Sequence, residues 1–455
     1  MSLRAILAIL LCKLLRVAAR LFRRGGTAMP GYWALKVCPE LLAVLSRDVK
    51  SVAVTGTNGK STTVRMVEQA LEDAGMSYFA NRSGANLISG IVTEFVMNCS
   101  VSGKMKKEYA VIECDEWAAK TVFPQMRPTA VIVTNIFRDQ LDRFGDVANT
   151  VSGIRAGLEG SPDTVMCLNA DCALTASLSS LPNRTVWYGM NNGALSAPDT
   201  ADLTDFDKCP VCGGALSYGW VNYGHLGGYA CAECGFKRPM PDFAVTYVAE
   251  RRVNGTSAVI ASGGKNRLIN IPIAGLYNVY NAAGAMAAMS VLGISANDSA
   301  RAIEHAHCGF GRMEQFDIGE SGATMILVKN AAGCNQVIDF LRNVKGRFSV
   351  VLVMNNNVSD GTDISWLNDT DFEALTGFAG LERVAVSGMR MEETERRLLD
   401  AGVDRARIER QSDYTGLVEW MMSREEHVFI LPTYTGMMEL RGYIVKAVGG
   451  KDFWE

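Results

Sequence analysis

One short segment, SVAVTGTNGKSTTVRM at residues 51–66, constrains the fold of this chain more than any other. Its apolar and β-branched start, Val52–Val54, is typical of a short buried strand, and a helix is expected to begin near Ser61. The glycines between them let backbone N–H groups close on phosphate oxygens, and the dipole of the following helix favours a bound anion. The segment therefore predicts a strand, a phosphate-binding loop and a helix.

We expect the residues of this loop to hold the phosphates of a nucleotide: Thr55, Gly56, Thr57, Asn58, Gly59, Lys60, Ser61 and Thr62. Lys60 would reach the β- and γ-phosphates, and the Ser61 hydroxyl would be a ligand of Mg²⁺. The common spacing G-x-x-x-x-G-K-[ST] is not met, because Gly56 and Gly59 are only three residues apart. An ordinary turn is the alternative, but it leaves a lysine at the start of a helix, where positive charge is unfavourable.

Length and composition restrict the number of domains, the kind of partner and the cellular compartment. A chain of 455 residues predicts about two to four domains, each with its own core. The formal net charge of −3, without a long run of like charge, gives no reason to expect nucleic acid and favours small molecules or proteins as partners. Of twelve cysteines, eight are scattered among apolar residues, which fits a reducing cytoplasm better than a disulfide framework. We therefore expect a cytoplasmic protein.

The first 24 residues imitate a signal peptide, because the apolar run Ala5–Cys12 follows Arg4. Lys13 ends this run, which is too short to cross a bilayer. Apolar residues at helical spacing are interspersed with basic ones, so we expect a helix packed on the first domain. The main alternative is a basic amphipathic helix that rests on the inner face of the membrane.

Strand-like runs at residues 51–55, 109–113 and 129–134 are separated by helical or looped stretches, as in a parallel sheet covered by helices. Functional groups of such sheets lie at the carboxyl ends of the strands. Glu113 ends the second run, so we expect it to be the carboxylate ligand of the magnesium ion that accompanies the nucleotide. Its alternative role is to cap the next helix.

Two C-x-x-C pairs lie near the middle of the chain with eighteen residues between them. They have the spacing of a four-cysteine zinc site, and a glycine follows each pair: Cys209, Cys212, Cys231 and Cys234. Four thiolates complete the tetrahedron around a zinc ion and leave no open position, so we expect a structural role. Redox pairs are the alternative. His225 lies between the pairs, and we expect it to be exposed to solvent.

Further along the chain, Asn278 and Asn281 share a face at the start of an expected helix and could hydrogen-bond a purine or ribose, although asparagine also caps helices. Arg312, in a glycine-flanked turn, could bind phosphate.

From about Thr324 the sequence again alternates strands and helices, which predicts a further α/β domain. Loops that follow its strands contain Lys329, Asn330, Asp360, Asp363 and Asp369.

Four motifs in this order, TGTNGKSTT, TNIFRDQLDRFG, GLYNVYNAAGA and GRME, resemble those of the Mur ligases and folylpolyglutamate synthases. The four-cysteine insertion, NRSGAN at residues 81–86, KNAAGCNQV and DGTDISW narrow the resemblance to the MurT family, the Mur-ligase-like subunits of lipid II isoglutaminyl synthases. Gln140 stands where Mur ligases commonly have a histidine, which puts a metal or substrate role of this position in doubt. Lys329 and Asn330 replace an Asp-Tyr-Ala-His loop, a departure that is part of the MurT resemblance.

The resemblance implies a three-domain α/β architecture. An N-terminal helical segment would occupy residues 1–48, a central parallel-sheet ATPase domain residues 49–313 with the zinc ribbon inserted at 205–240, and a Rossmann-like domain residues 314–455. The resemblance also implies ATP and Mg²⁺ as cofactors in addition to zinc. The implied contacts of ATP and its magnesium are Lys60, Ser61, Glu113, Asn278, Asn281, Arg312 and the loop glycines.

The implied reaction is an amidation driven by ATP. The α-carboxylate of D-glutamate in the lipid II stem peptide would be phosphorylated, and ammonia would attack the acyl phosphate to give D-isoglutamine. The chain offers no convincing glutaminase nucleophile, so ammonia would come from a GatD-like glutaminase in a heterodimer. An aspartate of the C-terminal domain would complete the Cys-His pair of that partner; the candidates are Asp360, Asp363 and, slightly favoured, Asp369. The alternatives are an amino-acid-adding ligase that acts alone and a nucleotide-binding scaffold that regulates another enzyme.

Overall fold

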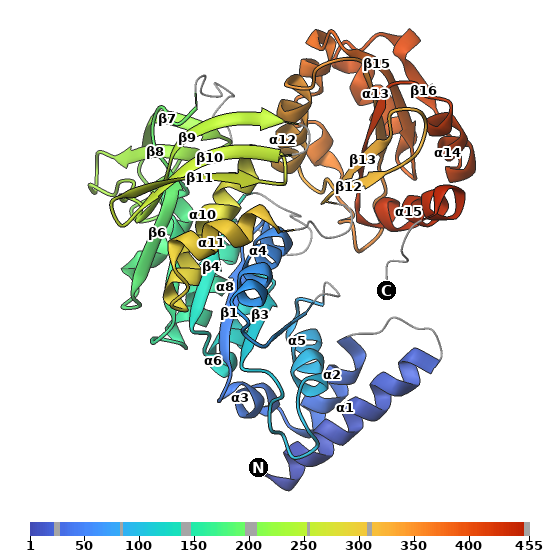
Figure 1. Ribbon diagram of the computed structural model, residues 1–455. Coiled ribbons are helices and arrows are strands. Elements are labelled where there is room, and N and C mark those ends of the chain that lie inside the picture. Colours follow the sequence, from blue (N-terminus) through green and yellow to red (C-terminus); the bar gives the residue numbers. More distant parts are fainter. Residues whose placement is uncertain are drawn as a thin grey trace.

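Two large sheets form the framework of the computed structural model (Figure 1). The structure describes residues 1–21, 28–81, 85–137, 147–195, 207–252, 255–306 and 312–449. A nine-stranded sheet is built from the first part of the chain, and a six-stranded sheet is built from the last part. Helices cover both sheets, so the predicted α/β class is confirmed.

The larger sheet has the strand order β11-β10-β9-β6-β5-β4-β1-β3-β2. Its strands are β1 (Lys50–Thr55), β2 (Tyr78–Ala80), β3 (Tyr109–Glu113), β4 (Ala130–Val133), β5 (Val165–Asn169), β6 (Thr185–Met190), β9 (Phe243–Arg252), β10 (Gly255–Ser262) and β11 (Lys265–Ile271). Neighbours from β2 to β9 are parallel, and β10 and β11 are antiparallel additions at one edge. Because β3 and β4 flank β1, their carboxyl ends meet beside the phosphate loop.

Helices cover the faces of this sheet because its central strands are apolar along nearly their whole length. They are α4 (Lys60–Asp73), α5 (Ile88–Met97), α6 (Ala119–Met126), α8 (Val147–Glu159), α9 (Ala173–Ala176), α10 (Leu276–Val291) and α11 (Ala296–Glu304), with the 3₁₀ turn η1 (Ser177–Ser180). The alanine-rich α10 packs on β4, β5 and β6 as well as on α4. Its small side chains allow this close packing, and its first turn therefore lies near the start of α4.

Three N-terminal helices share the hydrophobic core of the larger sheet: α1 (Leu3–Leu21), α2 (Ala28–Val37) and α3 (Leu41–Ser46). Ala8 and Cys12 of α1 are fully buried, as are Leu41 and Leu42 of α3. The expected packing of an N-terminal helix on the first domain is thus confirmed. Within the described ranges, no helix is both long enough and apolar enough to cross a bilayer.

The smaller sheet has the strand order β12-β13-β17-β14-β15-β16, with β12 antiparallel to β13 and the others parallel. Its strands are β12 (Arg312–Phe316), β13 (Ala323–Ile326), β14 (Phe348–Val353), β15 (Leu381–Ser387), β16 (Ile408–Arg410) and β17 (His427–Pro432). Its helices are α12 (Ala331–Arg342), α13 (Met391–Asp400), α14 (Tyr414–Met422) and α15 (Tyr434–Val448), with 3₁₀ turns η2 (Ser365–Leu367), η3 (Phe372–Gly377) and η4 (Arg405–Arg407). Alternate residues of β14 enter two separate apolar clusters, so both faces are covered.

A third, two-stranded sheet carries the cysteine pairs. Its strands, β7 (Leu216–Tyr223) and β8 (Leu226–Cys231), are antiparallel and joined by a short hairpin. The cysteines lie at the open end of this hairpin, and Tyr223 and Leu226 flank its tip. The tip joins the hydrophobic core of the larger sheet, whereas Leu216 and Tyr229 pack with the cysteines in a small core of their own.

Candidate active site

The phosphate loop runs from the end of β1 to the start of α4. Gly56 and Gly59 have φ angles of 116° and 87°, in the left-handed region that favours glycine. A Cβ atom on Gly59 would lie 2.2 Å from Asn281 Oδ1, so the loop approaches α10 too closely for a side chain at this position. The strand, loop and helix predicted from residues 51–66 are therefore present, and glycine is needed at both positions.

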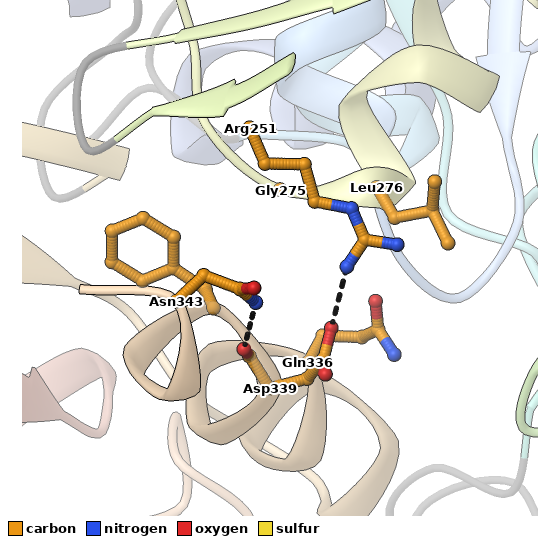
Figure 2. Close-up of a pocket in the computed structure, with 7 residues that line it drawn as sticks. Arg251, Gly275, Leu276, Gln336, Asp339 and Asn343 are labelled. Carbon is orange, nitrogen blue, oxygen red and sulfur yellow. Dashed lines mark hydrogen bonds and ion pairs between the residues drawn. The ribbon is translucent and has the colours of Figure 1, made fainter. Parts of the chain in front are cut away.

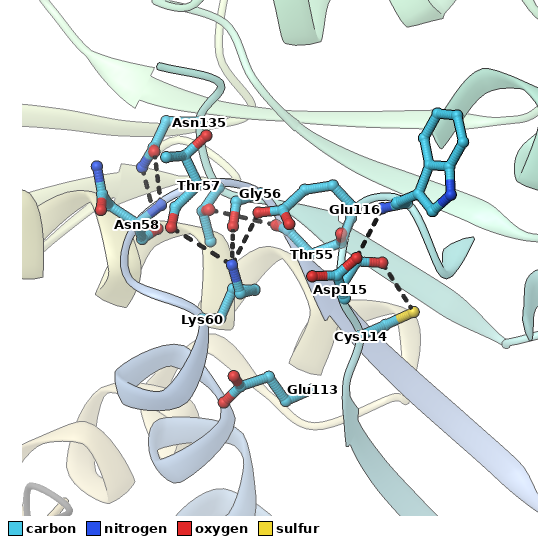
Figure 3. A network of polar contacts seen from close by, with 12 residues as sticks. Thr55, Gly56, Thr57, Asn58, Lys60, Glu113, Cys114, Asp115, Glu116 and Asn135 are labelled. Atoms are coloured by element: carbon cyan, nitrogen blue, oxygen red, sulfur yellow. Dashed lines mark hydrogen bonds and ion pairs between the residues drawn. The ribbon is translucent and has the colours of Figure 1, made fainter. Parts of the chain in front are cut away.

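Lys60 points back over the loop (Figure 3). Its Nζ donates to the Gly56 carbonyl oxygen at 2.5 Å and to Glu116 Oε1 at 2.8 Å. Burial lowers the pKa of Lys60, but the carboxylates of Glu116 and Glu113 outweigh this effect, and the net pKa is raised. Burial raises the pKa of Glu116, although Lys60 offsets part of that change. The loop therefore contains a buried, positively charged ammonium group.

Ser61 and Glu113 meet beside the loop, as a shared magnesium site requires. The Ser61 hydroxyl donates a hydrogen bond to Glu113 Oε2. Asn81 holds the Glu113 backbone, since its Nδ2 donates to the Glu113 carbonyl oxygen at 2.7 Å and its Oδ1 accepts from the Glu113 N–H at 2.8 Å. A hydroxyl and a carboxylate side by side fit the oxygen ligands that Mg²⁺ prefers. The turn before the next helix is held by Asp115 instead, whose Oδ1 accepts from the Trp117 N–H at 3.0 Å.

The segment after β4, residues 134–137, forms a wall along the phosphate loop. Thr57 N–H donates to the Asn135 carbonyl oxygen at 2.8 Å, and Asn58 N–H donates to Asn135 Oδ1 at 3.0 Å. The Phe137 N–H donates to Thr57 Oγ1 at 3.0 Å. These hydrogen bonds join the loop to a neighbouring strand and so fix the direction of its backbone.

The tip of the cysteine hairpin packs against this wall. Phe137 stacks on Tyr223 with ring centroids 5.8 Å apart, and the centroid of the His225 ring lies 4.5 Å from that of Phe137. His225 is buried, and its Nε2 lies 3.4 Å from Cys172 Sγ. Burial lowers the pKa of His225 to about 4, so the imidazole is neutral. The expectation that His225 is exposed is wrong, because the hairpin tip folds into the core of the larger sheet.

A buried polar network anchors the same hairpin. Asp171, which follows β5, accepts hydrogen bonds from Arg238 Nε at 2.8 Å and from the Tyr280 hydroxyl at 2.6 Å. Asn222, near the hairpin tip, donates to the Tyr280 hydroxyl at 2.7 Å. The network connects both ends of the cysteine hairpin to β5 and α10. The position of the hairpin is thus fixed relative to the phosphate loop.

The four hairpin cysteines form a cluster that could hold one metal ion. Their sulfur atoms all lie within 4.8 Å of one another, and the Cys209–Cys234 and Cys212–Cys231 sulfur separations are both 3.6 Å. Sulfur atoms about 2.3 Å from a tetrahedral zinc ion would be about 3.8 Å apart, so the arrangement fits. Each pair forms a tight turn, in which the N–H of the following glycine donates to the carbonyl oxygen of the first cysteine.

The C-terminal sheet meets the phosphate loop through α12. Asn330 caps this helix, and its Nδ2 lies 3.4 Å from Asn58 Oδ1. Two turns further along, Asp339 forms an ion pair with Arg251 of β9 at 3.2 Å (Figure 2). Figure 2 shows a pocket between the two sheets, lined by Arg251, Gly275, Leu276, Gln336, Asp339, Phe340 and Asn343. The candidate site therefore lies where the two sheet units meet.

Asn278 and Asn281 lie beside the loop at the start of α10, and both are buried. Asn278 Nδ2 donates to the Ala274 carbonyl oxygen at 2.6 Å, and Asn281 Nδ2 donates to Asn278 Oδ1 at 3.0 Å. Their contact with a nucleotide remains a prediction.

Arg312 begins β12, where its backbone pairs with Ile326, but its side chain lies outside the described residues. Gln140 also falls outside them.

The three candidate aspartates differ in exposure and in hydrogen bonding. Asp360 is buried, and its carboxylate accepts from the N–H and hydroxyl of Thr435, both at 2.6 Å, at the start of α15. Asp363 accepts from the Ser365 N–H at 2.8 Å and from the Ser365 hydroxyl at 2.9 Å. Asp369 is exposed, and among the described residues its carboxylate accepts no hydrogen bond. Asp369 is thus the candidate whose carboxylate is available to another chain.

Three residues of the site had no assigned role in the sequence. Glu116 pairs with Lys60, Asn135 binds the loop backbone, and Asn81 positions Glu113. Glu116 and Asn135 each lie just beyond the carboxyl end of a strand that flanks β1, which is the signal that could have identified them. Asn81 follows the edge strand β2, and no local pattern connects it with a residue 32 positions later.

A phosphate loop at the carboxyl end of an inner strand of a parallel sheet, followed by a second sheet unit that contacts it, defines the class as a ligase of the Mur type. Family models match as Mur ligase middle domain over residues 54–211 and as MurT ligase C-terminal over residues 327–437. A Streptococcus pneumoniae protein named lipid II isoglutaminyl synthase (glutamine-hydrolyzing) subunit MurT is 34% identical over 93% of this chain and 93% of its own length. The chain belongs to the MurT family.

A further relative has the same name, and solved structures share the fold. A Staphylococcus aureus protein of the same name is 31% identical over 94% of this chain and 95% of its own length. Among solved structures, a pseudomurein peptide ligase type C from Methanothermus fervidus has a TM-score of 0.66 at 22% identity, covering 88% of this chain and 79% of that one. MurF from Acinetobacter baumannii has a TM-score of 0.66 at 15% identity, with coverages of 90% and 80%. At such identities the two structures show the shared fold.

Proposed function

We propose that this chain is the ligase subunit of a lipid II isoglutaminyl synthase, which amidates the α-carboxylate of D-glutamate in the lipid II stem peptide. The observation that carries the proposal is the phosphate loop with Lys60, Ser61 and Glu113 gathered around it, in a chain that matches MurT proteins over nearly its whole length. The reaction consumes ATP and ammonia and yields D-isoglutamine. Because the proposed reaction uses ATP and lipid II, the proposed location is the cytoplasm, near the inner face of the membrane.

A carboxylate does not react directly with ammonia at neutral pH, because oxide is a poor leaving group. The carboxylate must therefore first be phosphorylated. A carboxylate oxygen attacks the γ-phosphorus of ATP, and ADP leaves. Ammonia then attacks the acyl carbon, and inorganic phosphate leaves with the former carboxylate oxygen. Lys60 would bind the β- and γ-phosphate oxygens, and Arg312 would add a second positive charge. Ser61 and Glu113 would hold Mg²⁺, which offsets charge on the transferring group.

A separate glutaminase is the proposed source of ammonia. A thiol nucleophile needs exposure and a lowered pKa. Outside the cysteine hairpin, each cysteine within the described residues is buried, and burial raises its thiol pKa: Cys12, Cys38, Cys99, Cys114, Cys167, Cys172 and Cys334. These features support a partner of the GatD type. Asp369, exposed at the end of η2, would orient the histidine of the partner's Cys-His pair.

Zinc is the metal proposed for the four hairpin cysteines. Protein purified without chelator should contain about one zinc ion per chain, and Cys209→Ser should lose it and lower the free energy of unfolding by several kcal/mol. Because the hairpin tip supports Phe137 beside the phosphate loop, the KM for ATP should also rise. Elemental analysis, thermal unfolding and ATP titration measure these effects.

The matched control for the zinc experiment is Glu233→Gln, an exposed residue between the second pair of cysteines. It should keep the zinc, the stability and the KM for ATP of the unchanged protein. Elemental analysis that finds no zinc in the unchanged protein would rule out the proposed metal. The proposal as a whole is tested by product analysis of lipid II after reaction with ATP and different amine donors.

A further inference from the structure

One side of α1 carries large apolar residues that the protein core does not use. Five of them recur at steps of four and three residues, which gives them a common face on the helix: Leu3, Leu7, Leu10, Leu14 and Val17. Their exposed fractions lie between 37% and 73%. The opposite side of the helix contributes Ala5, Ala8, Ile9 and Cys12 to the core. We call the five outward-facing residues the exposed stripe.

The adjacent helix α2 packs against α1 (Figure 1). It adds exposed aromatic side chains. Tyr32 and Trp33 are each 50% exposed, and their ring centroids are 5.7 Å apart in an edge-to-face arrangement. Groups of large exposed apolar side chains mark sites of interaction with a protein or a membrane. Tyrosine and tryptophan are enriched where membranes meet water, because each ring combines an apolar body with one polar group.

The sequence in and beside the exposed stripe is rich in basic residues. The first 39 residues contain seven lysines and arginines and no aspartate or glutamate. A neighbouring segment adds the exposed Lys104, Lys106 and Lys107, and it lies beside the start of α1, since a Cβ atom on Gly103 would be 2.2 Å from Met1 Sδ. Basic residues beside an apolar helix face complement the phosphates of anionic lipids.

We propose that the exposed stripe, with Tyr32 and Trp33, docks on a bilayer that contains anionic lipids, with α1 lying along the membrane surface. The helix cannot enter the bilayer fully, because its other face is packed in the protein core. A second copy of the chain would bring two basic surfaces together, which is unfavourable. The C-terminal sheet unit, which carries Asp369, lies at the other end of the molecule (Figure 1). The inference stands on the helical surface and is independent of the proposed reaction.

The test is sedimentation of the full-length chain with vesicles of phosphatidylglycerol and phosphatidylcholine. The unchanged protein should bind these vesicles, more weakly when phosphatidylglycerol is left out or salt is raised. Because two leucines would leave the apolar layer, the double variant Leu7→Glu and Leu14→Glu should reduce partitioning about tenfold or more. Lys104→Glu with Lys107→Glu should weaken binding to anionic vesicles but not binding to neutral ones.

The matched control is Leu268→Glu on β11, an exposed leucine far along the chain, which should bind vesicles like the unchanged protein. Thermal unfolding should show the same midpoint for the control and the double leucine variant. Equal vesicle binding by the double variant and the unchanged protein would overturn the proposal, as would a lack of binding by the unchanged protein. A double variant that binds vesicles normally but loses self-association or its glutaminase partner would assign the surface to a protein interface instead.

Discussion

Lys60→Met should lower the rate of ATP-dependent amidation by about a hundredfold to a thousandfold, because it removes a preorganised positive charge from the transferring phosphoryl group. In the structure this ammonium group is buried, held by the Gly56 carbonyl oxygen and paired with Glu116. Methionine preserves the apolar stem but cannot offset phosphate charge. The measurement is product formation from lipid II with saturating ATP and either ammonia or glutamine, and both rates should fall together.

The control for this variant is Lys50→Met, an exposed lysine at the opposite end of β1, which should retain the rate of the unchanged protein. Thermal unfolding should be recorded as well, since the substitution leaves Glu116 buried without its partner. The double variant Lys60→Met with Glu116→Gln would remove that unpaired charge. It would therefore separate the effect of Lys60 on folding from its effect on catalysis. If the Lys60→Met chain still amidated lipid II at the full rate, the proposed role of Lys60 at the transferring phosphoryl group would be wrong.

Asp369→Asn should abolish amidation with glutamine and leave amidation with free ammonia unchanged, when the ligase is assayed together with its glutaminase partner. The expected loss is about ten-thousandfold if this aspartate acts as the acid of a catalytic triad does. The carboxylate is exposed and its backbone carbonyl oxygen accepts a hydrogen bond from Asn335 of α12, so the loop that carries it is anchored to a helix. Glutamine hydrolysis and amidation should be measured in parallel.

Two neighbouring aspartates serve as controls for this position. Asp363→Asn should retain both activities, because among the described residues its carboxylate binds only the local Ser365 turn. Asp360→Asn should lose both activities through instability, because Asp360 is buried and holds the start of α15 through Thr435. Loss of both activities in Asp369→Asn, at normal stability, would instead indicate a role of Asp369 in the ATP reaction.

The phosphate loop and the cysteine cluster could be predicted because each is specified by short stretches of sequence. The phosphate loop needs glycine at fixed steps and a strand before it, and the cysteine cluster needs only two tight turns and their spacing. Both could therefore be predicted. The same holds for the contact between Ser61 and Glu113, because parallel pairing of β1 with β3 brings the ends of the two strands together.

Contacts between distant parts of the chain could not be predicted in this way. Nothing near His225 in the sequence indicates that the hairpin tip meets Phe137 and Cys172, since the direction of the hairpin depends on the Asp171 network. The three candidate aspartates look alike in sequence, but Asp360 is buried because it binds the start of α15, which begins about seventy residues later. Asn330 likewise meets Asn58 only because the second sheet unit lies against the first.

The identity of the product formed from lipid II tests the proposed function most directly. The chain and its glutaminase partner should be incubated with ATP, magnesium and glutamine labelled at its amide nitrogen, and the stem peptide analysed by mass spectrometry. We expect one labelled amide on the α-carboxyl group of D-glutamate, formed only when ATP and the partner are present. The chain alone with ammonia should give the same product without the label. Attachment of an amino acid by the chain alone, without amidation in the complex, would contradict the proposed function.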